Sequence, residues 1–190
     1  KIINKNKETE FTIGGSGLVS NRKGYDLFIQ IARYIKQNYP ANNIQFQWVG
    51  KINDKNKNII DEDLKKLELQ DSVKFIGQQL NPHQYFNNFD VFLMTSREDP
   101  FPLVCIEVAM LGKPIICFEK ATGTEEILKK GGGKIVPYLD IEKMSEAVMS
   151  YYDDHDSLNR DALKVKEVFK GFTPEDQCPK MYSIINNCIK

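Results

Sequence analysis

Six short apolar runs, each followed by a segment with helical spacing, constrain the fold of this 190-residue chain more than any other feature. Each run has the length of a buried strand and shows little alternation of apolar and polar residues, as parallel strands covered on both faces do. Repeated strand–helix alternation predicts an α/β fold with a doubly wound parallel sheet of about six strands. We expect these strands at residues 11–17, 44–50, 72–77, 91–96, 114–119 and 133–139.

The segments between and after the runs favour helices. Apolar side chains recur at helical spacing in two crossover segments, at Leu27, Phe28, Ile31 and Ile35 and again at Ile60, Leu64 and Leu67. Helical patterns alone continue after residue 140. A last one follows Thr173, which can cap a helix, and Pro174, which suits its first position. We therefore expect one α/β domain over residues 1–172 and a C-terminal helical tail over residues 173–190.

Composition and charge exclude several partners. Hydrophobic residues make up 41% of the chain and charged residues 27%, which suits a globular domain with a substantial core. The 26 basic residues are matched by 26 acidic ones, so the bulk charge gives no general attraction to nucleic acid or to an anionic membrane. No apolar run approaches the length of a membrane-spanning helix. Any anion-binding site must therefore be local.

Cysteine usage favours a reducing compartment. The four cysteines are Cys105, Cys117, Cys178 and Cys188. Their spacing is not that of a metal or redox site, and His83 and His155 lie far from them in the sequence. Cys105 and Cys117 lie in apolar segments, so we interpret them as small core residues of a cytoplasmic protein. The chain opens without a methionine, and we expect it to be part of a longer protein.

A glycine-rich stretch, GGSGLVSNRKG at residues 14–24, closes the first predicted strand. A dinucleotide fingerprint needs a third glycine, where this chain has Ser20, and an acidic residue after the second strand. A Walker loop needs a hydroxyl residue after Gly-Lys, but residues 23–25 read Lys-Gly-Tyr. What remains is a flexible turn followed by Arg22 and Lys23 at the start of a helix, where cations are unfavourable unless an anion joins them. The alternative is two solvated bases.

A second stretch, TSREDPFPLVCIEVAMLGKP at residues 95–114, closes the fourth predicted strand and opens a helix near Pro102 or Leu103. Its two prolines stiffen the turn, so the first free N–H groups of the helix point in a set direction and suit a phosphate. Glu107 lies one turn further on the same helical face, where a carboxylate can accept hydrogen bonds from the vicinal hydroxyls of a ribose. Asp99 lies across the turn, within reach of a sugar on a diphosphate. The alternatives are a structural carboxylate paired with a lysine or a backbone group at Glu107, and an ordinary turn residue at Asp99.

These two stretches, together with VKFIGQ and FDVFLMTSRED, resemble the C-terminal, donor-binding half of GT-B glycosyltransferases, specifically the family 4 retaining enzymes (glycosyl transferases group 1). The resemblance runs from about residue 11 to 150. Its signature is two acids separated by seven residues, here Asp99 and Glu107. It implies a Rossmann-like domain that forms one half of a GT-B architecture.

The resemblance also implies roles for individual residues. Glu107 would hold the ribose, Asp99 would contact the transferred sugar, and Lys23 would neutralise the diphosphate during catalysis. Further donor-binding positions are implied at Gly15, Ser16, Gly17, Arg22, Gly77, Gln78, Phe101, Pro102, Leu103 and Val104. No metal and no cofactor are expected beyond the nucleoside-diphosphate sugar, a UDP- or GDP-sugar.

The resemblance implies further partners that this chain does not contain. The family's acceptor, a glycan or a lipid, binds an N-terminal domain, toward which the tail helix from Thr173 would pack. The activity implied is that of a hexosyltransferase in polysaccharide biosynthesis, and we expect the fragment alone to be inactive. Any peripheral membrane contact would belong to the full-length protein. A non-catalytic nucleotide-binding or interaction module on the same fold is the alternative.

Overall fold

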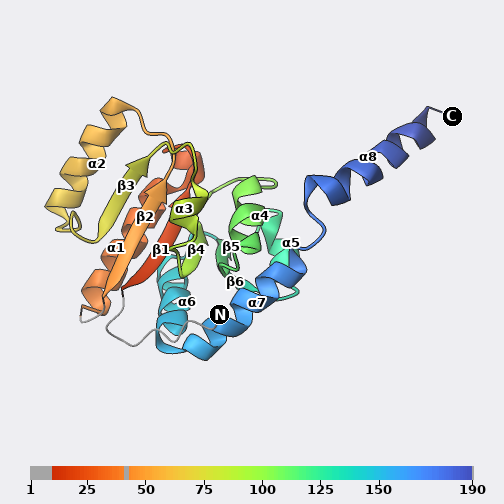
Figure 1. Cartoon of the computed structure of the whole chain (residues 1–190). Coiled ribbons are helices and arrows are strands. Elements are labelled where there is room, and N and C mark those ends of the chain that lie inside the picture. The colour runs from red at the N-terminus through yellow and green to blue at the C-terminus, as the bar shows by residue number, and fades with distance from the viewer. Residues whose placement is uncertain (1–9, 41–42, 190) are drawn as a thin grey trace.

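The computed structural model describes residues 10–40 and 43–189, which form a six-stranded parallel sheet in the order β3-β2-β1-β4-β5-β6 (Figure 1). Each neighbouring pair of strands is parallel. The strands are β1 (Phe11–Ser16), β2 (Ile44–Val49), β3 (Val73–Gly77), β4 (Val91–Met94), β5 (Ile115–Phe118) and β6 (Gly133–Val136). All six apolar runs of the sequence thus form strands, and the predicted doubly wound sheet is confirmed.

Helices connect successive strands and continue after the sheet ends. They are η1 (Asn21–Lys23), α1 (Tyr25–Asn38), α2 (Asp54–Lys66), α3 (His83–Phe86), α4 (Leu103–Met110), α5 (Thr124–Leu128), α6 (Ile141–Asp153), α7 (His155–Val168) and α8 (Pro174–Cys188). Side-chain caps start several of them: Asn53 accepts a hydrogen bond from the Asn56 amide at α2, and Asp140 accepts one from the Lys143 amide at α6.

The apolar strands divide their side chains between two cores, one on each face of the sheet. In β4, Val91 and Leu93 pack into one core, whereas Phe92 and Met94 pack into the other. The first core also takes the apolar faces of α1, α2 and α6, and the second takes those of α4, α5 and α7. Because successive strand residues point to opposite faces, both sets are buried, and this explains the missing period-two pattern in the sequence.

Two glycines in β1 give aromatic rings access to the middle of the sheet. A Cβ atom at Gly14 would lie 2.0 Å from the ring of Phe89, and one at Gly15 would lie 2.6 Å from the ring of Trp48. Phe89 and Trp48 are both 1% exposed. The first part of the glycine-rich stretch therefore serves the core, and only the residues after Ser16 reach the edge of the sheet.

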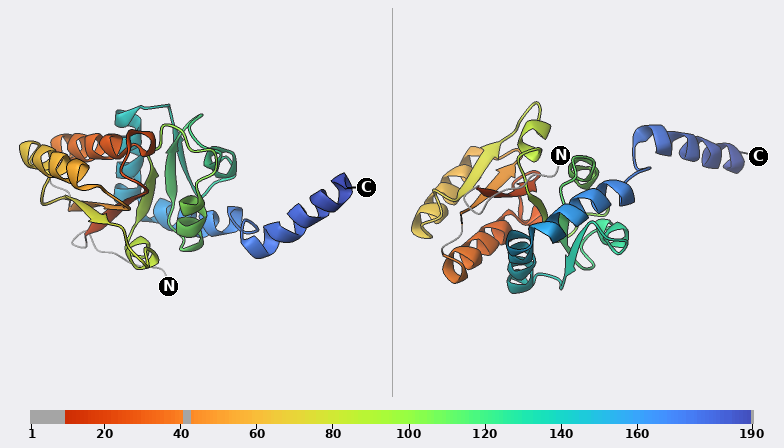
Figure 2. Two further views of the ribbon diagram at one scale, coloured as in Figure 1. Left: turned by 90° about the horizontal axis from the view of Figure 1, so that it is seen from above. Right: turned by 60° about the horizontal axis from the view of Figure 1, so that its bottom comes forward.

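The C-terminal helix α8 stands apart from the sheet. It begins at Pro174, with Thr173 as its N-cap residue, as the sequence predicts. Figure 2 shows it projecting away from the body of the domain in both views. Its large apolar side chains are exposed: Met181, Tyr182, Ile184, Ile185 and, just beyond its end, Ile189. No helix within the described residues is long and apolar enough to cross a membrane.

Candidate functional site

The switch point of the sheet lies between β1 and β4. The chain runs outward from β1 through β2 to β3, then returns to β4 on the other side of β1 (Figure 1). Ligands of open α/β sheets bind beyond the carboxyl ends of the strands at such a reversal. The loops that follow β1 and β4 are the two stretches that the sequence singles out. They meet at this edge.

Gly24 allows the loop after β1 to turn sharply into α1. Its φ of 73° lies in the left-handed region, and a Cβ atom there would lie 1.9 Å from the Thr95 carbonyl oxygen. The Thr95 hydroxyl donates to the Lys23 carbonyl at 3.2 Å. The backbone of the first loop therefore lies directly against the end of β4, which only glycine permits at this position.

Lys23 and Asp99 form an ion pair across the switch point. The Lys23 ammonium donates a hydrogen bond to Oδ2 of Asp99, and the two side chains are 17% and 11% exposed. Asp99 is held in turn by the Ala121 carbonyl, which accepts its amide at 2.9 Å. The two residues predicted to neutralise a diphosphate and to contact a sugar are thus adjacent and partly shielded from water, where electrostatic interactions are stronger than in bulk solvent.

Helix α4 presents free N–H groups beside this pair. Pro102 is its N-cap residue, and the first amide with an acceptor is that of Cys105, which donates to the Pro102 carbonyl at 3.0 Å. The amides of Leu103 and Val104 donate to no group among residues 10–40 and 43–189. The helix start near Leu103 is as predicted. Its free N–H groups and dipole can receive an anion.

Glu107 points toward solvent and not into the core. Its side chain is 41% exposed, and Oε2 lies 3.6 Å from Nε2 of His83 at the start of α3. In the part of the chain that the structure describes, no lysine or arginine pairs with this carboxylate, and its titratable neighbour is the His83 imidazole. The structural lysine pair considered as an alternative is therefore not present, and the carboxylate is accessible to a ligand.

Three glycines bring the ends of β1, β2 and β3 together. The Gly50 amide donates to the Gly77 carbonyl at 3.0 Å, and a Cβ atom at Gly50 would lie 1.9 Å from the Gly17 carbonyl oxygen. Open space surrounds Gly77, where a Cβ atom would meet nothing within 4 Å. Gln78 is exposed beside it. This open backbone is where the resemblance implies that a nucleotide base binds.

Other predicted residues have structural contacts of their own. Gly15 lies in the core beneath Trp48, and the Ser16 hydroxyl donates to the Val49 carbonyl at 2.8 Å. Arg22 donates to the Glu98 carbonyl at 3.0 Å, so it joins the two loops. Phe101 is 43% exposed, and its ring lies 5.6 Å from that of Phe172. Contact of these residues with a ligand stays a prediction.

Four further residues lie at this edge without having been predicted there: Asp26, His83, Thr95 and Arg97. Arg97 pairs with Asp26 between the two loops. Its one signal in the sequence is its place in TSRED, directly before the acids. His83 follows β3, as ligand-facing residues often do in such sheets, but its proximity to Glu107 arises from the packing of α3 beside α4.

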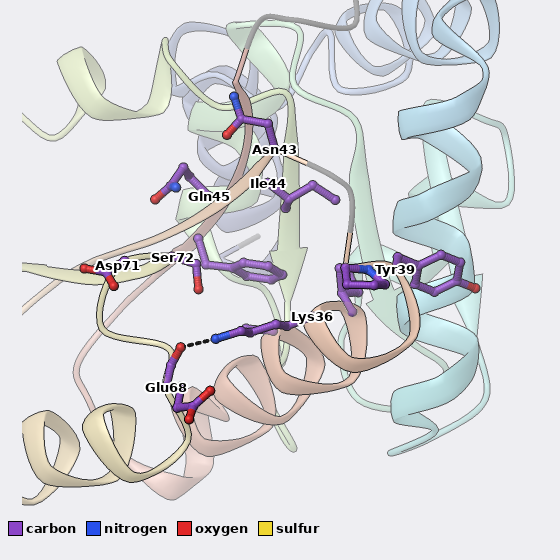
Figure 3. A pocket seen from close by; sticks show the side chains of 12 residues that line it. Lys36, Tyr39, Asn43, Ile44, Gln45, Glu68, Asp71 and Ser72 are labelled. Carbon is purple, nitrogen blue, oxygen red and sulfur yellow. Dashed lines mark hydrogen bonds between the residues drawn. The ribbon is translucent and has the colours of Figure 1, made fainter.

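A hollow lies at the opposite edge of the sheet, at the amino ends of β2 and β3 (Figure 3). It has a volume of about 270 Å³ and is lined by the end of α1 and by the residues that precede the two strands. Lys36 donates to the Glu68 carbonyl across it. It contains none of the predicted site residues.

The doubly wound parallel sheet defines a Rossmann-like α/β domain. At its switch point it brings together a lysine, a carboxylate and a free helix N-terminus. The chain belongs to the glycosyl transferases group 1 family, whose model matches residues 1–167. The fold is that of a GT-B glycosyltransferase domain, and the resemblance noted from the sequence is confirmed.

Curated relatives are similar over only part of their length. An uncharacterized glycosyltransferase of Haemophilus influenzae is 26% identical over 147 residues, which are 75% of this chain and 40% of the relative. The capsular polysaccharide biosynthesis glycosyltransferase CapM of Staphylococcus aureus is 26% identical over 155 residues, 81% of this chain and 39% of CapM. The chain thus spans about 40% of the length of these relatives.

Solved structures share the fold. Staphylococcus aureus TarM superposes with a TM-score of 0.82 at 20% sequence identity, over 98% of this chain and 38% of TarM, in a complex that contains UDP. Anabaena HepE in complex with UDP and glucose gives a TM-score of 0.78 at 21% identity, over 92% of this chain and 48% of HepE.

Proposed function

We propose that this chain is the nucleotide-sugar-binding domain of a glycosyltransferase that moves a sugar from a nucleoside-diphosphate sugar to a glycan or lipid acceptor. The observation that supports this most strongly is the Lys23–Asp99 pair beside the free amides of Leu103 and Val104. The group 1 family membership and the UDP complexes of proteins with the same fold agree with it.

In this proposal the diphosphate binds between Lys23 and the N-terminus of α4. Its negative charge is met by the ammonium and by two N–H groups that have no acceptor among the described residues. When the glycosidic bond breaks, charge grows on the leaving phosphate oxygen. Donors that are already in place stabilise that charge without reorganising, so they lower the barrier as well as bind the donor. This chemistry needs no metal ion.

Asp99 and Glu107 fix the two ends of the donor. When the diphosphate binds, the ion pair between Asp99 and Lys23 weakens. The Asp99 carboxylate then accepts hydrogen bonds from the hexose that is transferred. Glu107 is exposed one turn into α4, where it accepts hydrogen bonds from the ribose. The base then extends along the open backbone at Gly77 and Gln78. Transfer with retention of configuration is part of this proposal.

We assign the acceptor site to a second domain. The relatives are more than twice as long as the matched segment, and CapM carries a name from capsular polysaccharide biosynthesis. We therefore expect the chain alone to bind a donor without transferring its sugar. The exposed apolar residues of α8 fit a helix that packs against that second domain. We also propose a cytoplasmic location, which fits the cysteine usage of the chain.

Titration calorimetry with UDP and GDP tests the proposal. The Lys23→Ala and Glu107→Gln variants should each raise the Kd of the bound nucleotide about tenfold, because each removes one charge-assisted hydrogen bond. Lys143→Ala and Glu146→Gln are matched controls, since that pair is exposed on α6 and Glu146 is 43% exposed against 41% for Glu107. Both controls should leave the Kd unchanged.

Absence of binding to either nucleotide would contradict the proposal and favour an interaction module. Glu107→Leu separates a ligand role from a structural one. It should weaken binding while the melting temperature stays constant or rises, because the side chain is half-exposed and its loss leaves no buried charge behind. A severe loss of stability would indicate a structural carboxylate.

A further inference from the structure

We propose that Arg97 and Asp26 form a positioning pair that holds the Lys23 loop in register with the Asp99 loop. The inference rests on the proposed function, because it explains how the two predicted catalytic side chains reach one another. Arg97 follows β4, and Asp26 lies in the first turn of α1. Neither side chain lies at the free amides of α4. Their effect on a ligand is therefore exerted through the two loops.

Arg97 and Asp26 form a bidentate ion pair, which we call the clamp. Nη1 of Arg97 donates to Oδ1 of Asp26 at 2.9 Å, and Nη2 donates to Oδ2 at 2.8 Å. Two parallel hydrogen bonds fix direction as well as distance, and only the planar guanidinium can make them. The two side chains are 31% and 32% exposed. The pair is thus more protected from water than an ordinary surface ion pair, which contributes little.

The clamp is one of several contacts that join the two loops. Three consecutive carbonyls of the first loop accept hydrogen bonds from the second: Asn21 from Nη1 of Arg97 at 2.6 Å, Arg22 from the Arg97 amide at 2.9 Å and Lys23 from the Thr95 hydroxyl at 3.2 Å. These are the carbonyls of the three-residue helix η1, which is too short to satisfy all of them with its own amides. The Asn21 carbonyl also accepts the Gly24 amide at 3.1 Å. A single arginine therefore satisfies two of them and the Asp26 carboxylate as well.

The position of Asp26 makes the clamp favourable in the absence of ligand. A carboxylate in the first turn of a helix is stabilised by the helix dipole. Burial alone would raise the pKa of Asp26, but the hydrogen bonds and the charge of Arg97 outweigh it and lower the pKa. The carboxylate stays ionised at neutral pH, so the clamp is already closed when a nucleotide arrives.

This arrangement matters because the position of Lys23 depends on contacts from the loop after β4, and the short helix that contains Lys23 is not sufficient to fix it. It is the last residue of a three-residue helix and precedes Gly24, which lies in the left-handed region. Without the clamp, rotation around this glycine would move the ammonium relative to Asp99. A misplacement of about 1 Å can cost as much as a hundredfold in rate, so a contact outside the ligand site can control catalysis.

Amide exchange measured by NMR on the nucleotide-free chain tests the clamp directly. Arg97→Lys keeps the charge but cannot form the bidentate hydrogen bonds. It should therefore speed hydrogen exchange of the residue 97 amide about tenfold, because that amide donates to the Arg22 carbonyl. Exchange in the core strand β4, at Leu93, should stay unchanged. Arg160→Lys is the control, because Arg160 pairs with Asp154 at 3.8 Å on the exposed side of α7. Equal exchange at residue 97 in the wild type and Arg97→Lys would overturn the inference.

Nucleotide titration then tests the consequence for the site. Arg97→Lys and Asp26→Asn should each raise the Kd for the nucleotide about tenfold, and the double variant should be no worse than either single one, since the two residues act as a unit. Adding Lys23→Ala to Arg97→Lys should cost less than its effect in the wild type. Fully additive effects would overturn a positioning role. A wild type that binds no nucleotide would refute the proposed function, while the exchange measurement would still decide whether the clamp exists.

Discussion

Cys105 shows how far burial alone determines the chemistry of a residue. Its side chain is 1% exposed in the core beneath α4, and Cys117 in β5 is fully buried beside it. Burial raises the pKa of the Cys105 thiol to about 12, although a hydrogen bond with Thr124 opposes the shift. Burial also raises the pKa of Cys117. Both are therefore neutral thiols at physiological pH, as expected of small core residues.

This leads to a prediction for thiol labelling. At pH 8 a small disulfide reagent should modify Cys178 and Cys188 rapidly, because both are exposed on α8, and should modify Cys105 and Cys117 only after unfolding. The double variant Cys178→Ser/Cys188→Ser should show no fast phase. A fast phase in that variant would mean that the core opens more readily than its packing suggests.

At the scale of elements, the junction between η1 and α1 depends on one glycine. Gly24 combines a left-handed backbone with direct contact to Thr95. Gly171, between α7 and α8, has a similar φ of 94° but open space around it. Comparing alanine substitutions at these two positions therefore separates the free-energy cost of a left-handed backbone from the cost of a steric clash.

Gly171→Ala should lower the free energy of unfolding by about 1 kcal/mol, the usual cost of a left-handed alanine. Gly24→Ala should lower it by more than about 2 kcal/mol and should also weaken nucleotide binding, because β4 and the Lys23 loop must separate. Urea denaturation at constant m-value measures both changes. Equal losses in the two variants would show that the Thr95 contact relaxes without effect.

The elements themselves were largely predictable, whereas the contacts between them were not. Apolar runs such as that at residues 91–96 predict strands because burial on both faces leaves no polar position. The four-residue helix α3 has no periodicity to detect, so the contact of His83 with Glu107 could not be foreseen. Arg97 and Asp26 are 71 residues apart, and only the order of the strands brings them together.

At the scale of the whole molecule, the chain consists of a packed domain and a helix that adds nothing to its core. Phe169 is fully buried, and Phe172 packs against it and against Phe101. Beyond this point, none of the α8 side chains that the structure describes belongs to either core. We therefore predict that the boundary of the folding unit lies close to residue 172.

Two truncations test this boundary. A chain that ends at Phe172 should melt within about 2 °C of the parent, because the deleted residues bury almost no apolar surface. A chain that ends at Val168 also loses Phe169 and Phe172, and its melting temperature should fall by roughly 10 °C, given about 3–5 kcal/mol for removing a buried phenylalanine. Differential scanning calorimetry measures both. A large loss in the first truncation would show that α8 folds back onto the domain.

The central position of β1 and β4 has a consequence for local opening. Native proteins open first at their least protected segments, and in this sheet those are the outer strands β3 and β6. The two loops at the switch point are anchored to the innermost pair of strands, so fraying at either margin leaves their scaffold intact. Sequence changes in the outer strands can then accumulate without disturbing the strands that carry these two loops.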